Sequence, residues 1–113
     1  MIHYYDLDNE PFLAIKNNKK DIEMRLNDEK RQLISIGDLI EFRNNITDEK
    51  ILVKVLNLHH FKNFNDLYNT FPKSRLGYLE NDIADYKDMY KYYSQERINQ
   101  YGVLGIEIKK LED

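Results

Sequence analysis

Residues 20–26, KDIEMRL, alternate apolar and charged side chains, which is the pattern of a β-strand with one buried face. The apolar residues fall on one face, and Asp21, Glu23 and Arg25 fall on the other. Lys20 lies where the preceding turn becomes the strand, so the alternation does not decide its face. A chain with this strand must cover its apolar face with a core and accommodate a charged opposite face.

Lys20, Glu23 and Arg25 place two cations and one carboxylate on one strand within a short stretch. Such a group of charges is able to bind a small polar ligand. It is equally able to form ion pairs on a solvent-exposed face, which is the commoner arrangement at protein surfaces. The spacing alone leaves both interpretations open.

The segment before this strand predicts a strand followed by a short helix. Residues 2–7 have the alternation of a first short strand. Pro11 suits the first helical position, where its missing N–H is harmless. Phe12 and Ile15 are three residues apart and form the buried edge of the helix, which ends at residues 17–18, Asn-Asn.

The segment after the strand predicts an antiparallel hairpin. Residues 27–33 are polar and are expected to be irregular or to form one helical turn. A Gly-Asp turn at 37–38 precedes a strand over 39–43, and residues 44–48 contain the Asn, Thr and Asp typical of hairpin turns. The next strand, 51–58, is apolar on both faces, which predicts a central position in the sheet.

Three helices and a last strand are expected in the second half of the chain. Asn63 is able to cap a helix over residues 64–71, which Pro72 ends and a loop follows. Ser94 is able to cap a short helix before a last strand over 103–111. Between them a helix over 81–93 is expected from one stripe of side chains, namely Ile83, Tyr86, Tyr90 and Tyr93.

Strands interrupted by helices, without regular β-α alternation, favour an α+β fold with a mostly antiparallel sheet. The chain of 113 residues is expected to form one domain over 1–113, and its 42% hydrophobic and 33% charged residues are typical of a globular protein. No apolar run approaches the ~20 residues of a membrane helix, and the N-terminus does not have the pattern of a secretion signal. With no cysteine in the sequence, we expect a cytoplasmic location.

The sequence does not indicate a metal site, a cofactor or a serine nucleophile. The histidines are His3, His59 and His60, and they lack the spacing of a zinc motif. The serines are not in a G-x-S-x-G motif, and the four glycines lie too far apart to form a phosphate-binding loop. His3 is kept as a ligand-binding candidate because the first strand is expected to lie near the charged strand.

The positions of Lys20, Glu23 and Arg25 resemble the G-x-K-x-x-E-x-R signature of the ASCH domain family, which is similar to the PUA fold. Asn18 stands at the family's glycine, and asparagine also adopts the left-handed conformation of a helix end. Asp21 stands where relatives often have threonine. The resemblance covers nearly the whole chain, through residues 10–12 (EPF), 15–16 (IK), 37–38 (GD) and 101–103 (YGV).

The resemblance implies a small PUA-like, mostly antiparallel β-barrel with helices covering one opening. The motif strand would line a cleft between the barrel and the helices. In the favoured interpretation this cleft recognises RNA or a nucleoside- or nucleotide-like ligand, and Lys20 and Arg25 engage phosphate or carbonyl oxygens. Glu23 would orient Arg25 or accept from a base amino group, and Tyr93, at a junction between two predicted helices, would stack on a base or sugar.

An alternative follows from the same resemblance, because some small ASCH proteins are amidohydrolases that deacetylate N(4)-acetylcytidine. Their catalytic set is a lysine, a threonine and a glutamate. Lys20 matches the lysine, Glu23 stands at the threonine position, and Glu96 matches the distal glutamate only loosely. A carboxylate beside Lys20 holds its ammonium group charged, which is unfavourable for a nucleophile.

The charge distribution bears on the choice of ligand. The net charge of −3 argues against a protein that coats nucleic acid through bulk electrostatics. Residues 16–31 nevertheless carry +2, from six basic and four acidic residues. This segment contains the motif and suits a local anionic group better than a long duplex. A domain that binds a protein partner and no small ligand is a third possibility, and the sequence does not predict an oligomeric state.

Overall fold

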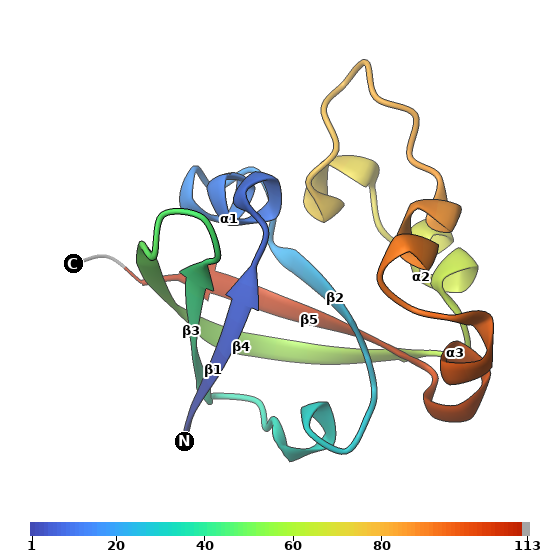
Figure 1. Ribbon diagram of the computed structural model, residues 1–113, viewed down its shortest axis with the longest axis horizontal. Coiled ribbons are helices and arrows are strands. Elements are labelled where there is room, and N and C mark those ends of the chain that lie inside the picture. The colour runs from blue at the N-terminus through green and yellow to red at the C-terminus, as the bar shows by residue number, and fades with distance from the viewer. Residues whose placement is uncertain (112–113) are drawn as a thin grey trace.

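Five strands form one curled sheet in the computed structural model, which describes residues 1–111 (Figure 1). Their order is β1-β3-β4-β5-β2, and only the β1–β3 pair is parallel. The prediction of a mostly antiparallel α+β fold is therefore confirmed, as is the central position of β4. The strands are β1 (Ile2–Leu7), β2 (Ile22–Leu26), β3 (Leu39–Asn44), β4 (Lys50–Phe61) and β5 (Val103–Lys110).

The helices lie in two groups beside this sheet. In Figure 1, α1 lies on one side of β2, and the segment from α2 to α3 lies on the other side. This arrangement leaves β2 between two sets of helices. The helical elements are α1 (Asn9–Lys16), α2 (Phe64–Thr70) and α3 (Gln95–Tyr101), and the 3₁₀ turns η1 (Arg31–Leu33), η2 (Lys73–Leu76) and η3 (Tyr86–Lys91).

The ends of the helices follow the local chemistry of the sequence, with one correction. Asn18 has φ of 58°, which is the left-handed conformation expected after α1. Asn63 accepts from the Asp66 N–H at 2.9 Å, and Ser94 accepts from the Arg97 N–H at 3.2 Å. Pro11 is the third residue of α1 rather than the first. It is tolerated there because the first four N–H groups of a helix lack intrahelical partners.

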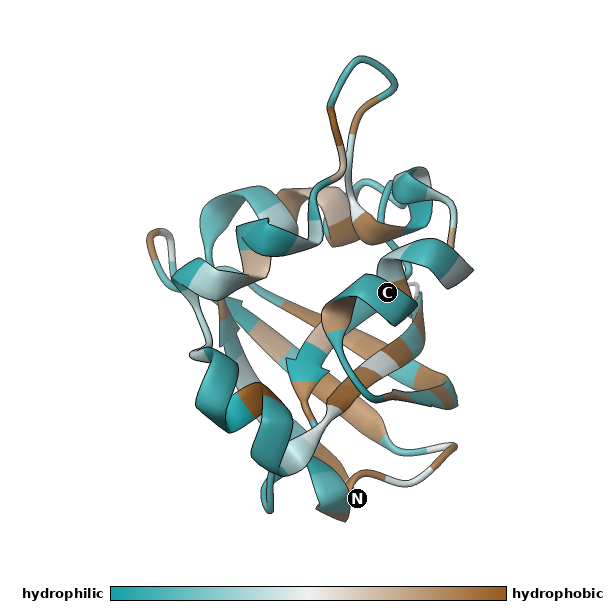
Figure 2. Ribbon diagram, turned by 90° about the vertical axis from the view of Figure 1, so that its right-hand side faces the viewer, coloured by the Kyte–Doolittle hydropathy of each residue, from teal (hydrophilic) through white to brown (hydrophobic). Residues whose placement is uncertain are grey.

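The core has two parts, and β2 contributes its apolar face to only one of them. One part lies within the curl of the sheet and against α1, and it includes Phe12, Phe42 and Ile106. The other part joins Ile22 and the other apolar residues of β2 to the α2–α3 segment. Figure 2 shows many hydrophobic residues on the strands and mostly polar residues on the helices.

The predicted helix over 81–93 is wrong. Residues 81–85 are irregular, and only the short turn η3 follows them. The Lys73 ammonium group donates to the carbonyls of Glu80 and Asp82 at 2.7 and 2.6 Å, so these carbonyls bind a side chain instead of helical N–H groups. Ile83 is 88% exposed, and the stripe that predicted the helix does not form. The segment instead projects as the loop at the top of Figure 1.

Membrane crossing by a helix is not supported within residues 1–111. None of the helices there is both long enough and apolar enough to span a bilayer.

Candidate functional site

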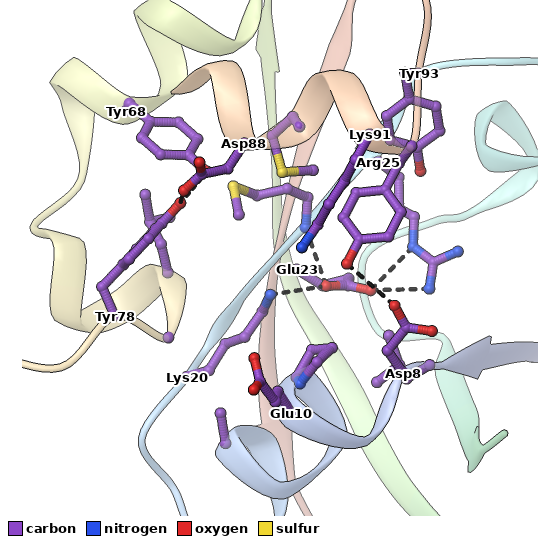
Figure 3. A pocket seen from close by; sticks show the side chains of 18 of the residues that line it. Asp8, Glu10, Lys20, Glu23, Arg25, Tyr68, Tyr78, Asp88, Lys91 and Tyr93 are labelled. Carbon is purple, nitrogen blue, oxygen red and sulfur yellow. Dashed lines mark hydrogen bonds and ion pairs between the residues drawn. The ribbon is translucent and has the colours of Figure 1, made fainter. Parts of the chain in front are cut away.

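A cavity of about 400 Å³ lies between α1 and the α2–η3 segment, with β2 contributing to its lining. Lys20, Glu23 and Arg25 all line it. Figure 3 shows that Lys20 and Arg25 approach the Glu23 carboxylate from opposite sides. The charged face of β2 is therefore enclosed by helices rather than exposed on an open surface.

Glu23 is the centre of a buried ion-pair network. Its Oε1 lies 3.1 Å from the Lys20 ammonium nitrogen, and its Oε2 lies 2.9 Å from Arg25 Nη2. Arg25 Nε also donates to Oε2 at 2.9 Å. The side chains of Lys20, Glu23 and Arg25 are only 7%, 4% and 12% exposed. Removal from water makes each of these contacts stronger than a surface ion pair and makes an unpaired partner costly.

Four contacts converge on the Glu23 carboxylate. A carboxylate offers about four lone-pair positions. Glu23 accepts hydrogen bonds from Arg25 Nε at 2.9 Å and from the Met24 N–H at 3.2 Å, and it forms ion pairs with the Lys20 ammonium group and Arg25 Nη2. Arg25 Nη2 also donates to the Asp6 carbonyl at 3.1 Å. Lys20 and Arg25 carry eight N–H donors in total by the usual inventory, about three and about five, and only some are used here. The network therefore presents donors to the cavity, which fits an orienting role for Glu23.

The two cations determine the ionisation of this carboxylate. Burial alone would raise the pKa of Glu23, but the charges and hydrogen bonds of Lys20 and Arg25 outweigh burial and hold the pKa below its usual value. Burial alone would lower the pKa of Arg25, but the Glu23 charge outweighs it and raises that pKa. The Glu23–Arg25 pair is therefore ionised at neutral pH.

The η2 segment holds Lys20 in place from the other side. The Asp21 N–H donates to the Arg75 carbonyl at 3.1 Å, and the Arg75 guanidinium group binds the Asp21 carboxylate at 2.9 and 3.2 Å. Gly77 has φ of +99°, and a Cβ built on it would lie 3.1 Å from Lys20 Cδ. Gly77 lies within the loop expected after Pro72, and no sequence signal indicates this contact.

Four tyrosines line the cavity, and only Tyr93 was among the predicted site residues. Tyr93 stacks on Phe64 with 5.9 Å between ring centroids, and burial raises the pKa of its hydroxyl. The Tyr78 hydroxyl donates to Asp88 at 2.7 Å and contacts the Tyr68 hydroxyl at 2.8 Å. The remaining tyrosine, Tyr92, donates to the Asp8 carboxylate at 3.1 Å. The only sequence signal for these residues is the high number of tyrosines, nine in the chain.

His3 and Glu96, two further candidates, do not line the cavity. His3 is buried with its Nε2 2.8 Å from Asp38, and β1 reaches the cavity only through its last residues, Asp6 and Leu7. Glu96 is exposed in the first turn of α3, which contributes no residue to the cavity lining. The linear sequence could not determine either placement, since each depends on where a strand or helix meets the cavity.

The cavity carries more carboxylates than cations. Its three cations, Lys20, Arg25 and Lys91, face six carboxylates, so the formal charge of the lining is 3 − 6 = −3. Glu23 is the buried carboxylate between Lys20, which precedes β2, and Arg25 on β2. The other five are exposed side chains contributed by the flanking segments, namely Asp6, Asp8, Glu10, Asp82 and Asp88.

Metal binding finds no support in this geometry. Within residues 1–111, no group of three or more histidines or carboxylates is arranged to hold a metal ion.

Comparisons with known proteins agree with the fold and the motif. The hypothetical protein PH0355 is 29% identical in sequence to this chain. Its crystal structure matches with a TM-score of 0.83 over 98% of this chain and 100% of that one. The solution structure of protein PF0455 from Pyrococcus furiosus is also 29% identical, with a TM-score of 0.76 over both whole chains. A mutant of ZmASCH from Zymomonas mobilis is 15% identical, with a TM-score of 0.67 over 96% of this chain and 67% of that one.

A search of curated proteins found no match. Residues 6–112, however, match the model of the ASCH domain family. This match covers the β2 motif, both sets of helices and nearly all of the sheet. The chain therefore belongs to the ASCH domain family and has its PUA-like fold.

Proposed function

We propose that this protein is a binding module whose cavity recognises a nucleotide-sized element of RNA or a nucleotide-like ligand. The observation that carries the proposal is the buried network in which Glu23 holds Lys20 and Arg25 at the cavity. The cavity volume of about 400 Å³ is within the range of small-molecule sites, about 300–1,000 Å³. Membership of a family with a PUA-like fold is consistent with this function but does not by itself establish it.

Lys20 and Arg25 supply the donors in this proposal, and Glu23 orients them. Their N–H groups suit carbonyl oxygens on the edge of a base. Tyr92 and Tyr93 offer ring faces on which a base or sugar would stack. The excess of carboxylates around the cations repels a phosphate, so the cavity favours an uncharged base over the backbone.

Replacing Lys20 with methionine is expected to weaken RNA binding about tenfold, since one hydrogen bond from a charged group contributes about 1.5–3 kcal/mol and part of it is recovered from water. Methionine keeps an unbranched stem in the buried position, and Arg25 still pairs with Glu23. The measurement is fluorescence anisotropy with a labelled ten-nucleotide single-stranded RNA. Arg25→Met is expected to act in the same direction.

The matched control is Lys62→Met, because Lys62 is exposed and lines neither the cavity described here nor the neighbouring one. Thermal unfolding of each variant separates loss of binding from loss of fold. Equal RNA affinity in the wild type, Lys20→Met and Arg25→Met would place the RNA surface elsewhere on the protein.

Amidohydrolase activity on N(4)-acetylcytidine is the alternative, and little or none is expected. The Lys20 ammonium group lies in a buried ion pair. Glu23 is paired with two cations and has a pKa below its usual value, so it is a poor acid–base group. Glu96 is outside the cavity lining. Chromatography of released cytidine measures the reaction. Rapid turnover by the wild type that is lost in Lys20→Met would make the enzyme the correct interpretation.

A further inference from the structure

A second cavity, of about 600 Å³, adjoins the first one at Lys20. Its walls come from the end of α1, the end of β5 and the segment after η2. Lys20, Gly77 and Tyr78 line both cavities, so the Lys20 side chain and the Gly77 backbone form the boundary between them. A ligand that occupied both cavities would have to pass this boundary.

The second cavity has the opposite charge to the first. Its lining contains five cations and two carboxylates, Asp21 and Glu80, which gives a formal charge of 5 − 2 = +3, or +2 without Lys20, which also lines the first cavity and is paired with Glu23 there. The first cavity has a formal charge of −3 by the same count. An anionic group of a ligand is therefore attracted to the second cavity and repelled from the first. The cations are Lys19, Lys20, Arg75, Lys109 and Lys110.

Two of these cations are available for a ligand. Arg75 is bound to Asp21, and the Lys110 ammonium group donates to the Lys16 carbonyl at 2.8 Å. Lys19 and Lys109 are exposed, and among residues 1–111 neither forms an ion pair or a side-chain hydrogen bond. Their ammonium groups are thus free to bind an anion at this cavity.

The strand register places a further cation close to Lys109. Lys109 on β5 is directly opposite Lys54 on β4, and Lys54 is also exposed. Like charges directly opposite each other on neighbouring strands destabilise a sheet. An anion bound beside Lys109 would screen this repulsion, which adds to the attraction of the cavity for phosphate.

We propose that the second cavity binds a backbone phosphate of the nucleotide whose base occupies the first cavity, through Lys19 and Lys109. This inference rests on the proposed function of the first cavity and specifies its ligand. The ligand is a nucleotide or a single strand that carries a phosphate, rather than a free nucleoside. The uncharged base lies among the carboxylates of the first cavity, and the phosphate lies among the cations of the second.

The test is the double variant Lys19→Ala/Lys109→Ala, with the double variant Lys62→Ala/Lys87→Ala as its matched control. All four lysines are exposed, and Lys62 and Lys87 line neither cavity. Anisotropy of the labelled ten-nucleotide RNA is measured at several salt concentrations. Nucleosides, nucleoside 5′-monophosphates and inorganic phosphate serve as competitors, so that a bound nucleotide is distinguished from bound phosphate alone.

The Lys19→Ala/Lys109→Ala variant is expected to bind RNA about fivefold to tenfold more weakly. Its salt slope is expected to be smaller by about 0.7 for each phosphate that the variant no longer binds. In the wild type, monophosphates should compete better than nucleosides, and the double variant should remove most of this difference. The Lys62→Ala/Lys87→Ala control should retain both the affinity and the difference.

The outcomes separate this inference from the proposed function. If RNA affinity, salt slope and the monophosphate preference are unchanged in Lys19→Ala/Lys109→Ala while Lys20→Met is impaired, the phosphate site is wrong and the base site stands. If the control loses as much affinity as the test variant, the effect is general electrostatics and the inference is overturned. Competition by inorganic phosphate alone, as strong as that of monophosphates, also overturns it. If the wild type binds neither RNA nor nucleotides, both proposals fail together.

Discussion

Glu23→Ala is expected to lower the free energy of unfolding by about 3–5 kcal/mol, because it leaves two buried cations without their counter-charge. Lys20 and Arg25 are only 7% and 12% exposed, and Glu23 is the partner of both. Breaking this buried network is thus expected to cost more free energy than breaking an ion pair on the exposed surface, which contributes about 0–1 kcal/mol.

Urea unfolding followed by circular dichroism measures this change, with Glu96→Ala as the control. Glu96 is exposed and should change the free energy of unfolding by no more than about 0.5 kcal/mol. Glu23→Gln keeps the shape of the side chain but removes its charge. Its decrease in the free energy of unfolding should therefore lie between those of Glu23→Ala and Glu96→Ala. A Glu23→Ala variant as stable as the Glu96→Ala control would contradict the proposed role of the buried network.

Gly77→Ala is expected to lower the free energy of unfolding by about 2–3 kcal/mol, from backbone strain together with overpacking against Lys20. Its φ of +99° is unfavourable for any residue with a Cβ, and the new Cβ would lie 3.1 Å from Lys20 Cδ. The Lys20 side chain must move to relieve this contact. RNA affinity should therefore fall as well, because the Lys20 ammonium group would no longer be held at the boundary of the two cavities.

Gly37→Ala is a matched control for this contact. Gly37 has nearly the same backbone conformation, with φ of +94°, but a Cβ built on it has no heavy atom within 4 Å. The Gly37 variant should show the loss due to backbone strain alone, about 1–2 kcal/mol, with unchanged RNA affinity. Equal effects of the two substitutions on both stability and RNA binding would show that contact with Lys20 is not important.

Sequence patterns were sufficient where structure depends on neighbouring residues. The alternation over residues 20–26 predicted β2, and the two apolar faces of residues 51–58 predicted a central β4. Asn63 and Ser94 cap helices as expected, because a cap depends on a backbone N–H only a few residues away. The motif of Lys20, Glu23 and Arg25 similarly indicated the family, which the match over residues 6–112 confirms.

Sequence patterns failed where a segment is held by a distant one. The helix expected over 81–93 does not form, and the Lys73 ammonium group instead binds the carbonyls of Glu80, just before that range, and of Asp82, within it. Helical spacing describes only which side chains would share a face if a helix formed. It carries no information about a competing hydrogen-bond donor from a neighbouring turn.

The sequence by itself determined the strand that carries Glu23 and Arg25, with Lys20 just before it, together with the family to which the chain belongs. Only the tertiary structure decided that this strand face is enclosed, that Gly77 lies against the Lys20 stem, and that cavities of opposite charge meet there. The physical reason is the range of each interaction. Alternation and capping depend on residues a few positions apart, whereas the cavity walls join Glu10, Lys20 and Tyr78, which come together only when the helices pack on either side of β2.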